Sequence, residues 1–333
     1  MDGILKISEE ERRALFRNTA QKMGVHEAII EKDYWVCLIL DYLFHKSRYR
    51  NHLTFKGGTS LSKCFNVIKR FSEDIDLVLD WRLLGYEKDE PWQERSKTKQ
   101  GHFNKEANDR AEAFLSEEML PVFTADVSEV LGEAAVFEIG MDNLQAINFY
   151  YPQLFANESI FQSVRLEIGA LAAWTPAVER TVTPYVFEFY PNLAQAASTV
   201  VTTSSAERTF WEKVTILHHE ANRPLNLEMP MRYSRHYYDL CCLAKTEYKT
   251  VALRRLDLFQ KVVLFKMKFY SRAWAKYEEA VQGSVKLVPP VFRFESLRTD
   301  YENMREMLFG EYPSFETLME SIECLENEIN RKQ

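Results

Sequence analysis

Two aspartates in the sequence stand at a spacing that suits divalent-metal chemistry. Asp74 and Asp76 alternate with Ile75 and Leu77 in the run DIDLVL, a pattern typical of a β-strand. Side chains two residues apart in a strand point to the same face, so the two carboxylates lie side by side while the apolar residues enter the core. Like charges held this close are unfavourable unless a cation lies between them. The pair therefore predicts a metal site, and Mg²⁺ suits its oxygen ligands.

A turn containing two glycines precedes these acids. Gly57 and Gly58 follow a short strand expected at Leu53–Lys56 and begin an amphipathic helix. Glycine is needed where φ is positive or where the backbone approaches a ligand closely, and the free amides at a helix start attract phosphate. Such a turn alone is also an ordinary strand–helix connection, and the following Ser-x-Asp-x-Asp run is what favours a phosphate site. The residues expected to contact phosphate are Lys56, Gly57, Gly58, Thr59, Ser60, Lys63, Arg70 and Ser72.

These two features, KGGTSL followed by RFSEDIDL, resemble the nucleotidyltransferase fold shared by DNA polymerase beta and aminoglycoside nucleotidyltransferases. The residues of these two motifs are similar to those of a narrower branch, the AbiEii/AbiGii toxin family of type IV toxin–antitoxin systems, which includes the MenT toxins. The resemblance extends from about Glu31 to Asp239. It implies an α+β fold: a mixed β-sheet flanked by helices, followed by a C-terminal helical domain. It also implies an NTP substrate, Mg²⁺ and a cognate antitoxin.

A third acid is expected on a later strand. The run Phe161–Gly169 alternates, and Glu167 lies between Leu166 and Ile168 in an apolar–acid–apolar pattern. The resemblance implies that Glu167 completes the metal site or accepts a proton, whereas the residues alone also allow an exposed glutamate on an edge strand. Arg165 shares the face of Glu167, and we expect it to meet a phosphate or to pair with Glu167.

Two later phrases match catalytic-site motifs of the family. A capping box, Ser-Ser-Ala-Glu, begins a helix expected at residues 204–220. Lys213 lies at the edge of the apolar stripe of this helix, where a lysine usually extends its charge to solvent. The resemblance of ERTFWEKVTILH instead implies a catalytic Lys213 that neutralises the leaving pyrophosphate, with Asp239 of SRHYYDL as its partner. His236 stands where the family often has an acid, so the carboxylate assignment is open.

Three consecutive charged residues, Glu31, Lys32 and Asp33, open the helix expected at His26–Lys46. Their charge predicts an exposed first turn. The phrase EKDY also matches one that recurs ahead of the Gly-Gly motif in the family, which implies a site role for Lys32 or Asp33. The residues themselves favour the exposed turn.

Composition is typical of a globular protein. The 333 residues are 46% hydrophobic and 27% charged, enough for a substantial core and two subdomains. No apolar run approaches the roughly 18 residues of a membrane helix, and the first residues lack a secretory-signal pattern. The five cysteines lack paired metal-ligand spacing, so we expect reduced thiols in a cytoplasmic protein.

Charge is unevenly placed along a chain whose net charge is −7. The segment Arg232–Lys276 holds eleven Lys and Arg against three acids, and Asp300–Glu328 holds nine acids against one Arg. This asymmetry indicates either a basic groove for phosphates or two solvated helix faces that pair with each other. The sequence favours neither alternative.

The expected architecture has two parts. Residues 1–201 form N-terminal helices and the nucleotidyltransferase core, and residues 202–333 form a helical domain. Further helices are predicted at residues 8–23, 104–120, 254–277 and 314–330. Further strands are predicted at residues 122–127, 135–139, 146–151 and 185–189.

The resulting functional hypothesis is a Mg²⁺-dependent nucleotidyltransferase, by resemblance a toxin that transfers a nucleoside monophosphate to tRNA. The basic segment Arg232–Lys276 suits an RNA backbone. One alternative is transfer to a small molecule or a protein hydroxyl, for which acceptor binding lacks a steep salt dependence. Another is a nucleotide-binding regulator without turnover, which pyrophosphate release would exclude. The expected partners are an NTP, an RNA acceptor and a cognate antitoxin, with no membrane.

Overall fold

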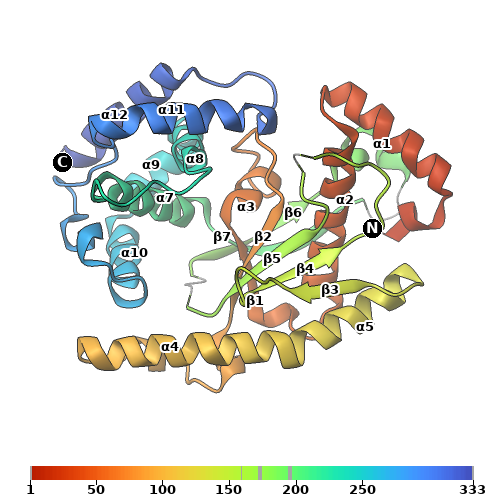
Figure 1. The fold of residues 1–333 in the computed structure, drawn as a ribbon, viewed down its shortest axis with the longest axis horizontal. Helices are drawn as coiled ribbons and strands as arrows, with labels where there is room; N and C mark the ends of the chain where they lie inside the picture. Colours follow the sequence, from red (N-terminus) through yellow and green to blue (C-terminus); the bar gives the residue numbers. More distant parts are fainter. Residues whose placement is uncertain (1, 159, 172–174, 194–196, 332–333) are drawn as a thin grey trace. The chain divides into compact units, whose positions relative to one another are not determined.

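The computed structural model describes residues 2–158, 160–171, 175–193 and 197–331 (Figure 1). Its internal contacts divide the chain into two compact units. The sheet unit comprises residues 1–64 and 72–204, and the helical unit comprises residues 65–71 and 205–333. The predicted division near residue 201, into a nucleotidyltransferase core and a C-terminal helical domain, stays a prediction.

A mixed seven-stranded sheet forms the centre of the sheet unit, with the strand order β3-β4-β5-β2-β1-β7-β6. The pairs β2–β5 and β1–β7 are parallel and the other neighbours are antiparallel. This sheet, with its flanking helices and the helices that follow, confirms the predicted α+β class. The strands are β1 (Leu53–Lys56), β2 (Asp74–Leu79), β3 (Val136–Ile139), β4 (Ala146–Tyr150), β5 (Val164–Gly169), β6 (Ala177–Val182) and β7 (Thr199–Ser204).

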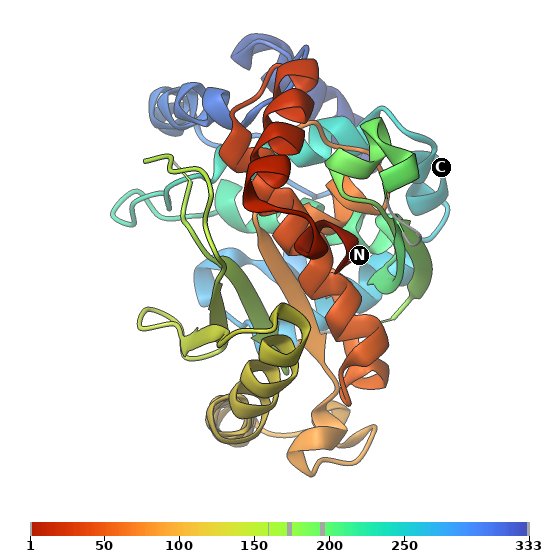
Figure 2. The same ribbon diagram turned by 90° about the vertical axis from the view of Figure 1, so that its right-hand side faces the viewer.

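Helix α2 is the buried helix of the sheet unit. Its side chains from Ala28 to Leu40 are all buried, as expected for a helix that is covered on every side. Trp35 stacks on Tyr151 with the ring centroids 5.6 Å apart and meets Phe149 of β4 edge-on, which fixes α2 to the sheet. Figure 2 shows the ribbon of α2 lying along the sheet. The helices of this unit are α1 (Glu9–Met23), α2 (Glu27–Asp41), α3 (Gly57–Lys63), α4 (Lys97–Phe114), α5 (Leu120–Leu131) and α6 (Tyr185–Phe189).

Helix α7 organises the helical unit. Ser205 caps its start, and Trp211 packs against Phe259 of α10 with the ring centroids 4.3 Å apart. Trp211 also donates its indole N–H to the carbonyl of Ala252. Among the described residues of the whole chain, no helix is both long and apolar enough to span a membrane. The helices of this unit are α7 (Ala206–Ala221), α8 (Ser234–Ala244), α9 (Glu247–Leu253), α10 (Leu256–Phe269), α11 (Phe294–Asn303) and α12 (Phe315–Asn330).

Two predicted strands are helices in the structure. Residues 122–127 belong to α5, because Pro121 lies in the first turn of that helix, where its missing N–H costs nothing. A π-helical turn at Leu115–Met119 joins α4 to α5, and Figure 1 shows the pair as one long rod. Residues 185–189 form α6, which Pro184 starts in the same way.

One predicted helix extends too far in the sequence, and two strands of the structure were not predicted. The expectation at residues 254–277 was a single helix, but α10 ends at Phe269. Beyond it the chain makes 3₁₀ turns. Lys276 has φ 50°, a left-handed conformation that does not fit within a right-handed α-helix. Strands β6 and β7 were not predicted. β6 is an edge strand in which apolar and polar residues do not alternate, so it lacks the pattern by which strands are found.

Candidate functional site

The glycine turn and the second aspartate of β2 are in direct contact. Gly57 begins α3 with φ 83°, in the left-handed region that glycine adopts without strain. A Cβ at this position would lie 1.8 Å from Oδ2 of Asp76. The positive φ predicted for a glycine therefore holds at Gly57, and a side chain there would also collide with Asp76. No other amino acid fits between the turn and this carboxylate.

The predicted acids share one face of the sheet. Ile75 and Leu77 are fully buried, and Asp74 and Asp76 alternate with them on the other face. In the parallel pair β2–β5, Asp76 is the register partner of Glu167. β5 lies between β4 and β2, so Glu167 is not on an edge strand as the alternative interpretation required. The sheet thus brings three acids to one surface.

This surface brings several negative charges together. Burial, together with the charges of Glu73, Asp76 and Glu167, raises the pKa of Asp74 to about 6. A cation bound there would remove that cost. Yet among the described residues no three His, Cys, Asp or Glu side chains are arranged as a metal-binding group. Asp74 and Asp76 are thus a pair of acids on one face rather than a preformed three-ligand cage.

Glu167 is engaged by its strand neighbour. Arg165 places Nε 3.1 Å from Oε1 of Glu167, one of the two pairings that the sequence predicted for this arginine. The same guanidinium holds Asp142 with two hydrogen bonds of 3.0 and 2.9 Å. The side chain of Glu167 nevertheless remains 42% exposed, so it is accessible to a substrate.

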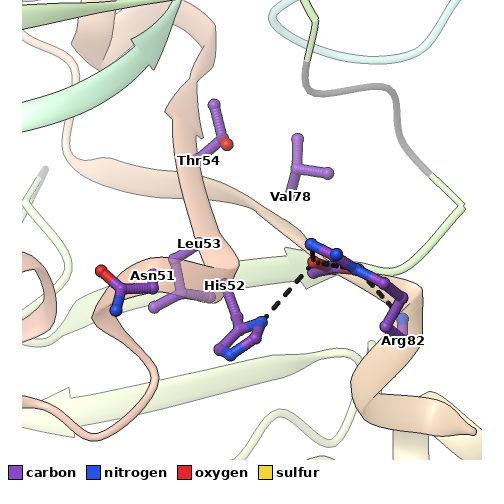
Figure 3. Close-up of a pocket in the computed structure, with 7 residues that line it drawn as sticks. Asn51, His52, Leu53, Thr54, Val78 and Arg82 are labelled. Carbon is purple, nitrogen blue, oxygen red and sulfur yellow. Dashed lines mark hydrogen bonds and ion pairs between the residues drawn. The ribbon is translucent and has the colours of Figure 1, made fainter. Parts of the chain in front are cut away.

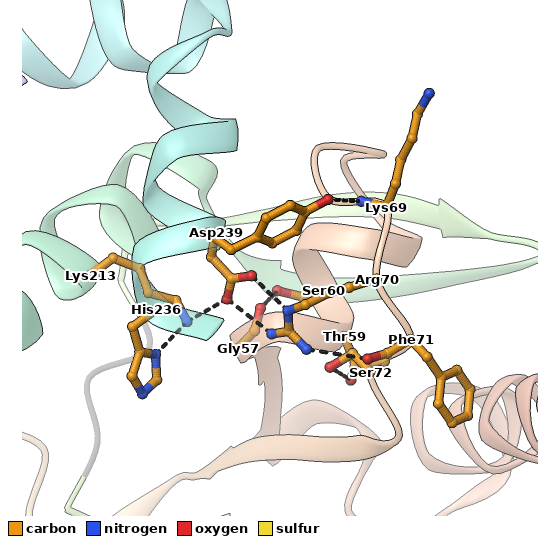
Figure 4. A network of polar contacts seen from close by, with 11 residues as sticks. Gly57, Thr59, Ser60, Lys69, Arg70, Phe71, Ser72, Lys213, His236 and Asp239 are labelled. Atoms are coloured by element: carbon orange, nitrogen blue, oxygen red, sulfur yellow. Dashed lines mark hydrogen bonds and ion pairs between the residues drawn. The ribbon is translucent and has the colours of Figure 1, made fainter. Parts of the chain in front are cut away.

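The hydroxyl groups of the glycine turn are bonded within the sheet unit. Thr59 donates to the carbonyl of Asp74 at 2.5 Å and lies 2.9 Å from Oγ of Ser72 (Figure 4). Ser60 donates to the carbonyl of Gly57 at 2.9 Å. These bonds tie the turn to the start of β2. The predicted role of these hydroxyls as phosphate ligands stays a prediction.

Lys63 also points into the sheet unit. It is buried and forms an ion pair of 2.7 Å with Asp33 of α2, and its ammonium lies 3.7 Å from the ring centroid of Tyr185. Of the other expected phosphate ligands, Lys56 is the register partner of Asp76 on β1, and Gly58 is buried in α3.

A second polar cluster lies in the helical unit, centred on Asp239 of α8 (Figure 4). Arg70 binds both oxygens of this fully buried carboxylate, at 2.7 and 2.9 Å. Lys213 of α7 reaches Oδ2 of Asp239 at 2.7 Å and lies 3.0 Å from Nδ1 of His236. The structure therefore brings together Lys213 and Asp239, as predicted, and adds Arg70 and His236 to them.

The charges of this cluster compensate one another. Burial alone would raise the pKa of Asp239, but Arg70 and Lys213 outweigh it and hold that pKa below its usual value. Burial lowers the pKa of Lys213 and, with the nearby cations, lowers the pKa of His236 well below its ordinary value. His236 is therefore neutral at physiological pH and accepts a hydrogen bond from Lys213.

Arg70 reaches this cluster because residues 65–71 belong to the helical unit. Phe71 donates its N–H to Met307 at 2.7 Å, and Phe309 donates to Lys69 at 2.8 Å, so the segment pairs with the chain near Leu308. Ser72 and Asp74, in contrast, belong to the sheet unit. The chain therefore passes from the glycine helix α3 through residues 65–71 of the helical unit to β2, the strand of Asp74 and Asp76.

A small cavity lies at the other end of the β1–β2 pair, away from Lys56 and Asp76 (Figure 3). Its volume is about 90 Å³, and it contains the ion pair of Asp80 with Arg82. Ligand pockets are usually about 300 Å³ or larger, so this cavity holds a few water molecules rather than a nucleotide. Its lining residues are Asn51, His52, Leu53, Thr54, Val78, Asp80 and Arg82.

The expected exposed turn on α2 is wrong. Glu31, Lys32 and Asp33 are all buried, and each has its own partners. Glu31 accepts the backbone N–H groups of Leu154 and Phe155, at 2.7 and 2.9 Å. A signal was present in the sequence, because these charges stand inside the apolar helix EAIIEKDYWVCLILD, where burial is expected on all sides.

The chain is similar to known proteins in two comparisons. A family model described as nucleotidyl transferase AbiEii toxin, type IV TA system, matches residues 39–321. Among solved structures, MenT4, a nucleotidyltransferase toxin from Mycobacterium tuberculosis H37Rv, is 16% identical. That similarity covers 95% of this chain and 96% of that chain with a TM-score of 0.48. No curated protein sequence matches.

Proposed function

Because the chain belongs to the nucleotidyl transferase AbiEii toxin family of type IV toxin–antitoxin systems, and is thus a nucleotidyltransferase, we propose that it transfers a nucleoside monophosphate from an NTP to RNA with Mg²⁺. The family match confirms the resemblance on which the sequence-based hypothesis rested. Membership also implies an NTP substrate and a cognate antitoxin. The observation that carries the proposal is the contact between the Asp76 carboxylate and Gly57, on the sheet face that Asp74 and Glu167 share.

Asp74 and Asp76 are the proposed metal ligands. The observation that supports them is the pKa of Asp74, which burial and then the neighbouring acids raise to about 6, and which a divalent cation would lower again. Mg²⁺ is commonly held by one or two carboxylates together with substrate phosphates and water, so two protein ligands suffice. When bound, the ion stabilises negative charge on the reacting phosphoryl group. Glu167, exposed beside Asp76, is proposed to complete the site or to accept the proton of the attacking hydroxyl.

The glycine turn is the proposed triphosphate-binding segment. Gly57 has no side chain between its backbone and Asp76, so phosphate oxygens can approach both. We assign Lys56, Gly58, Thr59, Ser60 and Ser72 to the same binding region.

In the helical unit, two cations share the single carboxylate of Asp239, which leaves a net positive charge. We assign Lys213 and Arg70 to neutralising the departing pyrophosphate, and Asp239 to holding them in place. Fixed cations are the usual means of stabilising charge in phosphoryl transfer.

The proposed acceptor is tRNA, in keeping with a cytoplasmic protein. The segment Arg232–Lys276 carries exposed cations, among them Lys261, which is 69% exposed. One of the nine acids of the acidic segment, Glu328, pairs with Lys249 at 2.9 Å, so part of the basic segment is neutralised within the helical unit. The remaining charge supports binding of a phosphate backbone.

Incubation with each labelled NTP, Mg²⁺ and total RNA tests the proposal. We expect label on RNA of tRNA size, release of pyrophosphate, and loss of both in Asp74→Asn/Asp76→Asn. The matched control is Asp142→Asn, which removes an exposed acid beside Arg165 and leaves Asp74 and Asp76 intact. Pyrophosphate release with label on a small molecule or on protein would identify the alternative acceptors. Nucleotide binding without pyrophosphate release would contradict the enzymatic proposal.

A further inference from the structure

Three buried charges on α2 have no part in the chemistry described above. Glu31, Lys32 and Asp33 are 0%, 1% and 5% exposed. Lysine and acidic side chains are almost never buried to this degree unless they are paired. Each of the three holds a different part of the sheet unit, so their partners indicate what the burial achieves.

Asp33 fixes the end of α3. One of its carboxylate oxygens forms the 2.7 Å ion pair with Lys63, the last residue of that helix, and the other accepts the backbone N–H of Tyr185 at 2.7 Å. The side chains of Lys63 and Asp33 are each 5% exposed. A buried pair of this kind has little freedom to rearrange, because separating it leaves an unpaired charge in the interior. Helix α3 is therefore fixed to α2 at the end opposite Gly57.

Lys32 fixes the residue before β2. Its ammonium lies 2.6 Å from Oε2 of Glu73 and 2.6 Å from the carbonyl oxygen of Phe161. Glu73 is itself buried and immediately precedes Asp74. The contact to Phe161 ties the same ammonium to the segment that leads into β5, the strand of Glu167.

Together the two ion pairs hold both places where the chain leaves and re-enters the sheet unit. Residues 65–71 belong to the helical unit, so residues 64 and 72 are the points of departure and return. Lys63 directly precedes residue 64 and Glu73 directly follows residue 72, both within the sheet unit. They act together with the hydrogen bonds of Thr59, which join the glycine turn to the start of β2.

We propose that Lys32 and Asp33 are positioning residues for nucleotidyl transfer, which hold the glycine turn and the Asp74–Asp76 strand in register without touching the substrate. This inference rests on the proposed function of that turn and strand. It also reassigns Lys63 from phosphate binding to this anchoring role. Misplacement of reacting groups by about 1 Å can reduce a rate about 10²-fold, so the expected effect is on turnover.

The test compares Lys32→Met and Asp33→Asn with Glu31→Gln as the matched control. Glu31 lies on the same helix and is equally buried, but it binds the backbone of Leu154 and Phe155 rather than residues 57–76. All variants are assayed well below their melting temperatures. We expect Lys32→Met and Asp33→Asn to lower kcat about 10²-fold. We expect Glu31→Gln to keep kcat within about threefold while losing comparable stability.

Two further variants distinguish a loss of positioning from simple unfolding. Lys32→Arg keeps the charge, and Asp33→Asn/Lys63→Gln replaces the ion pair with a neutral hydrogen-bonding pair. Recovery of kcat in either supports positioning. A wild-type kcat in Lys32→Met or Asp33→Asn, or equal losses of kcat in all three single variants, would overturn the inference.

Hydrogen exchange separates this inference from the proposed function. In Lys32→Met and Asp33→Asn, we expect faster exchange of the amides of residues 57–63 and 72–76. In Glu31→Gln we expect faster exchange near residues 154–155 instead. This readout needs no enzymatic activity, so it still tests the anchoring if no NTP is a substrate. Unchanged exchange at residues 57–76 in both variants would reject the anchoring itself.

Discussion

The sheet unit and the helical unit each contain a partly or fully buried aspartate at their polar centre, and the two aspartates have opposite surroundings. Asp74 is surrounded by other acids, and its pKa is raised to about 6. Asp239 is bound by Arg70 and Lys213, and its pKa is held below its usual value despite complete burial. The sheet unit therefore has a surplus of negative charge, and the helical cluster has a surplus of positive charge.

This difference in the sign of the local charge favours a different kind of ligand in each region. Surplus negative charge on oxygen atoms favours a divalent cation, and surplus positive charge favours an anion such as pyrophosphate. The same difference in charge predicts that substitutions in the two regions change stability in opposite directions. Removing an acid from the sheet face relieves repulsion, whereas removing Asp239 leaves two buried cations without their partner. Variants of the two aspartates should therefore behave differently.

The largest effect is expected on turnover in the sheet unit. Asp76→Asn should reduce nucleotidyl transfer about 10³-fold, because it removes a proposed metal ligand beside the glycine turn. The melting temperature should stay the same or rise, since one of several like charges is lost. Steady-state kinetics and a thermal melt of the same sample check both. Retention of full activity would remove Asp76 from the site.

The second effect is expected on the stability of the helical unit. Asp239→Asn should lower the free energy of unfolding by about 3–5 kcal/mol, because Arg70 and Lys213 lose their shared carboxylate. Urea denaturation measures this loss. Glu167→Gln, an exposed acid of the sheet unit, serves as the control and should change stability by less than about 1 kcal/mol. Equal effects of the two substitutions would contradict the contrast between the units.

The third effect is stabilisation by the metal. Mg²⁺ at about 100 times its dissociation constant should raise the free energy of unfolding by about 2.7 kcal/mol in the wild type. Asp74→Asn/Asp76→Asn should abolish this gain. Lys213→Met should retain it, since Lys213 is not a proposed ligand. A gain that survives in the double variant would place the metal elsewhere.

The smallest effect concerns pH without divalent cations. The folded pKa of Asp74 is above its unfolded value of 3.8, so its contribution to stability is lost as pH rises from about 4 to about 6. Asp239 has the opposite sign, because its folded pKa is lowered and its contribution is lost as the solution is acidified. Asp74→Asn should therefore increase stability at pH 7 by about 1–2 kcal/mol and leave it unchanged at pH 4. Unfolding curves at the two pH values measure this difference, and an equal gain at both would contradict the assignment.

Local patterns were sufficient to predict part of this molecule. The alternation around Asp74 and Asp76 and the conformational requirement of Gly57 depend on neighbouring residues only, and the structure has both. Strands were predicted at residues 122–127 and 185–189, but Pro121 and Pro184 each stand at the start of a helix there, a position that proline often occupies.

The features that were not predicted depend on pairing between residues far apart in the sequence. Lys32 meets Glu73 across 41 residues, and Arg70 meets Asp239 across 169, separations at which no periodicity carries information. The rule that charged residues face solvent therefore failed for Lys32 and Asp33, since their partners could not be identified from the sequence. The role of Arg70 was missed in the same way.

The position of residues 65–71 has a consequence for biosynthesis. A ribosome must add 169 residues after Arg70 before Asp239 is made, and the partner of Phe71 at Met307 comes later still. During that interval Arg70 and Phe71 cannot form these two contacts, although β1 and β2 on either side have already been synthesised. These native contacts of residues 65–71 therefore form only after the helical unit has been synthesised.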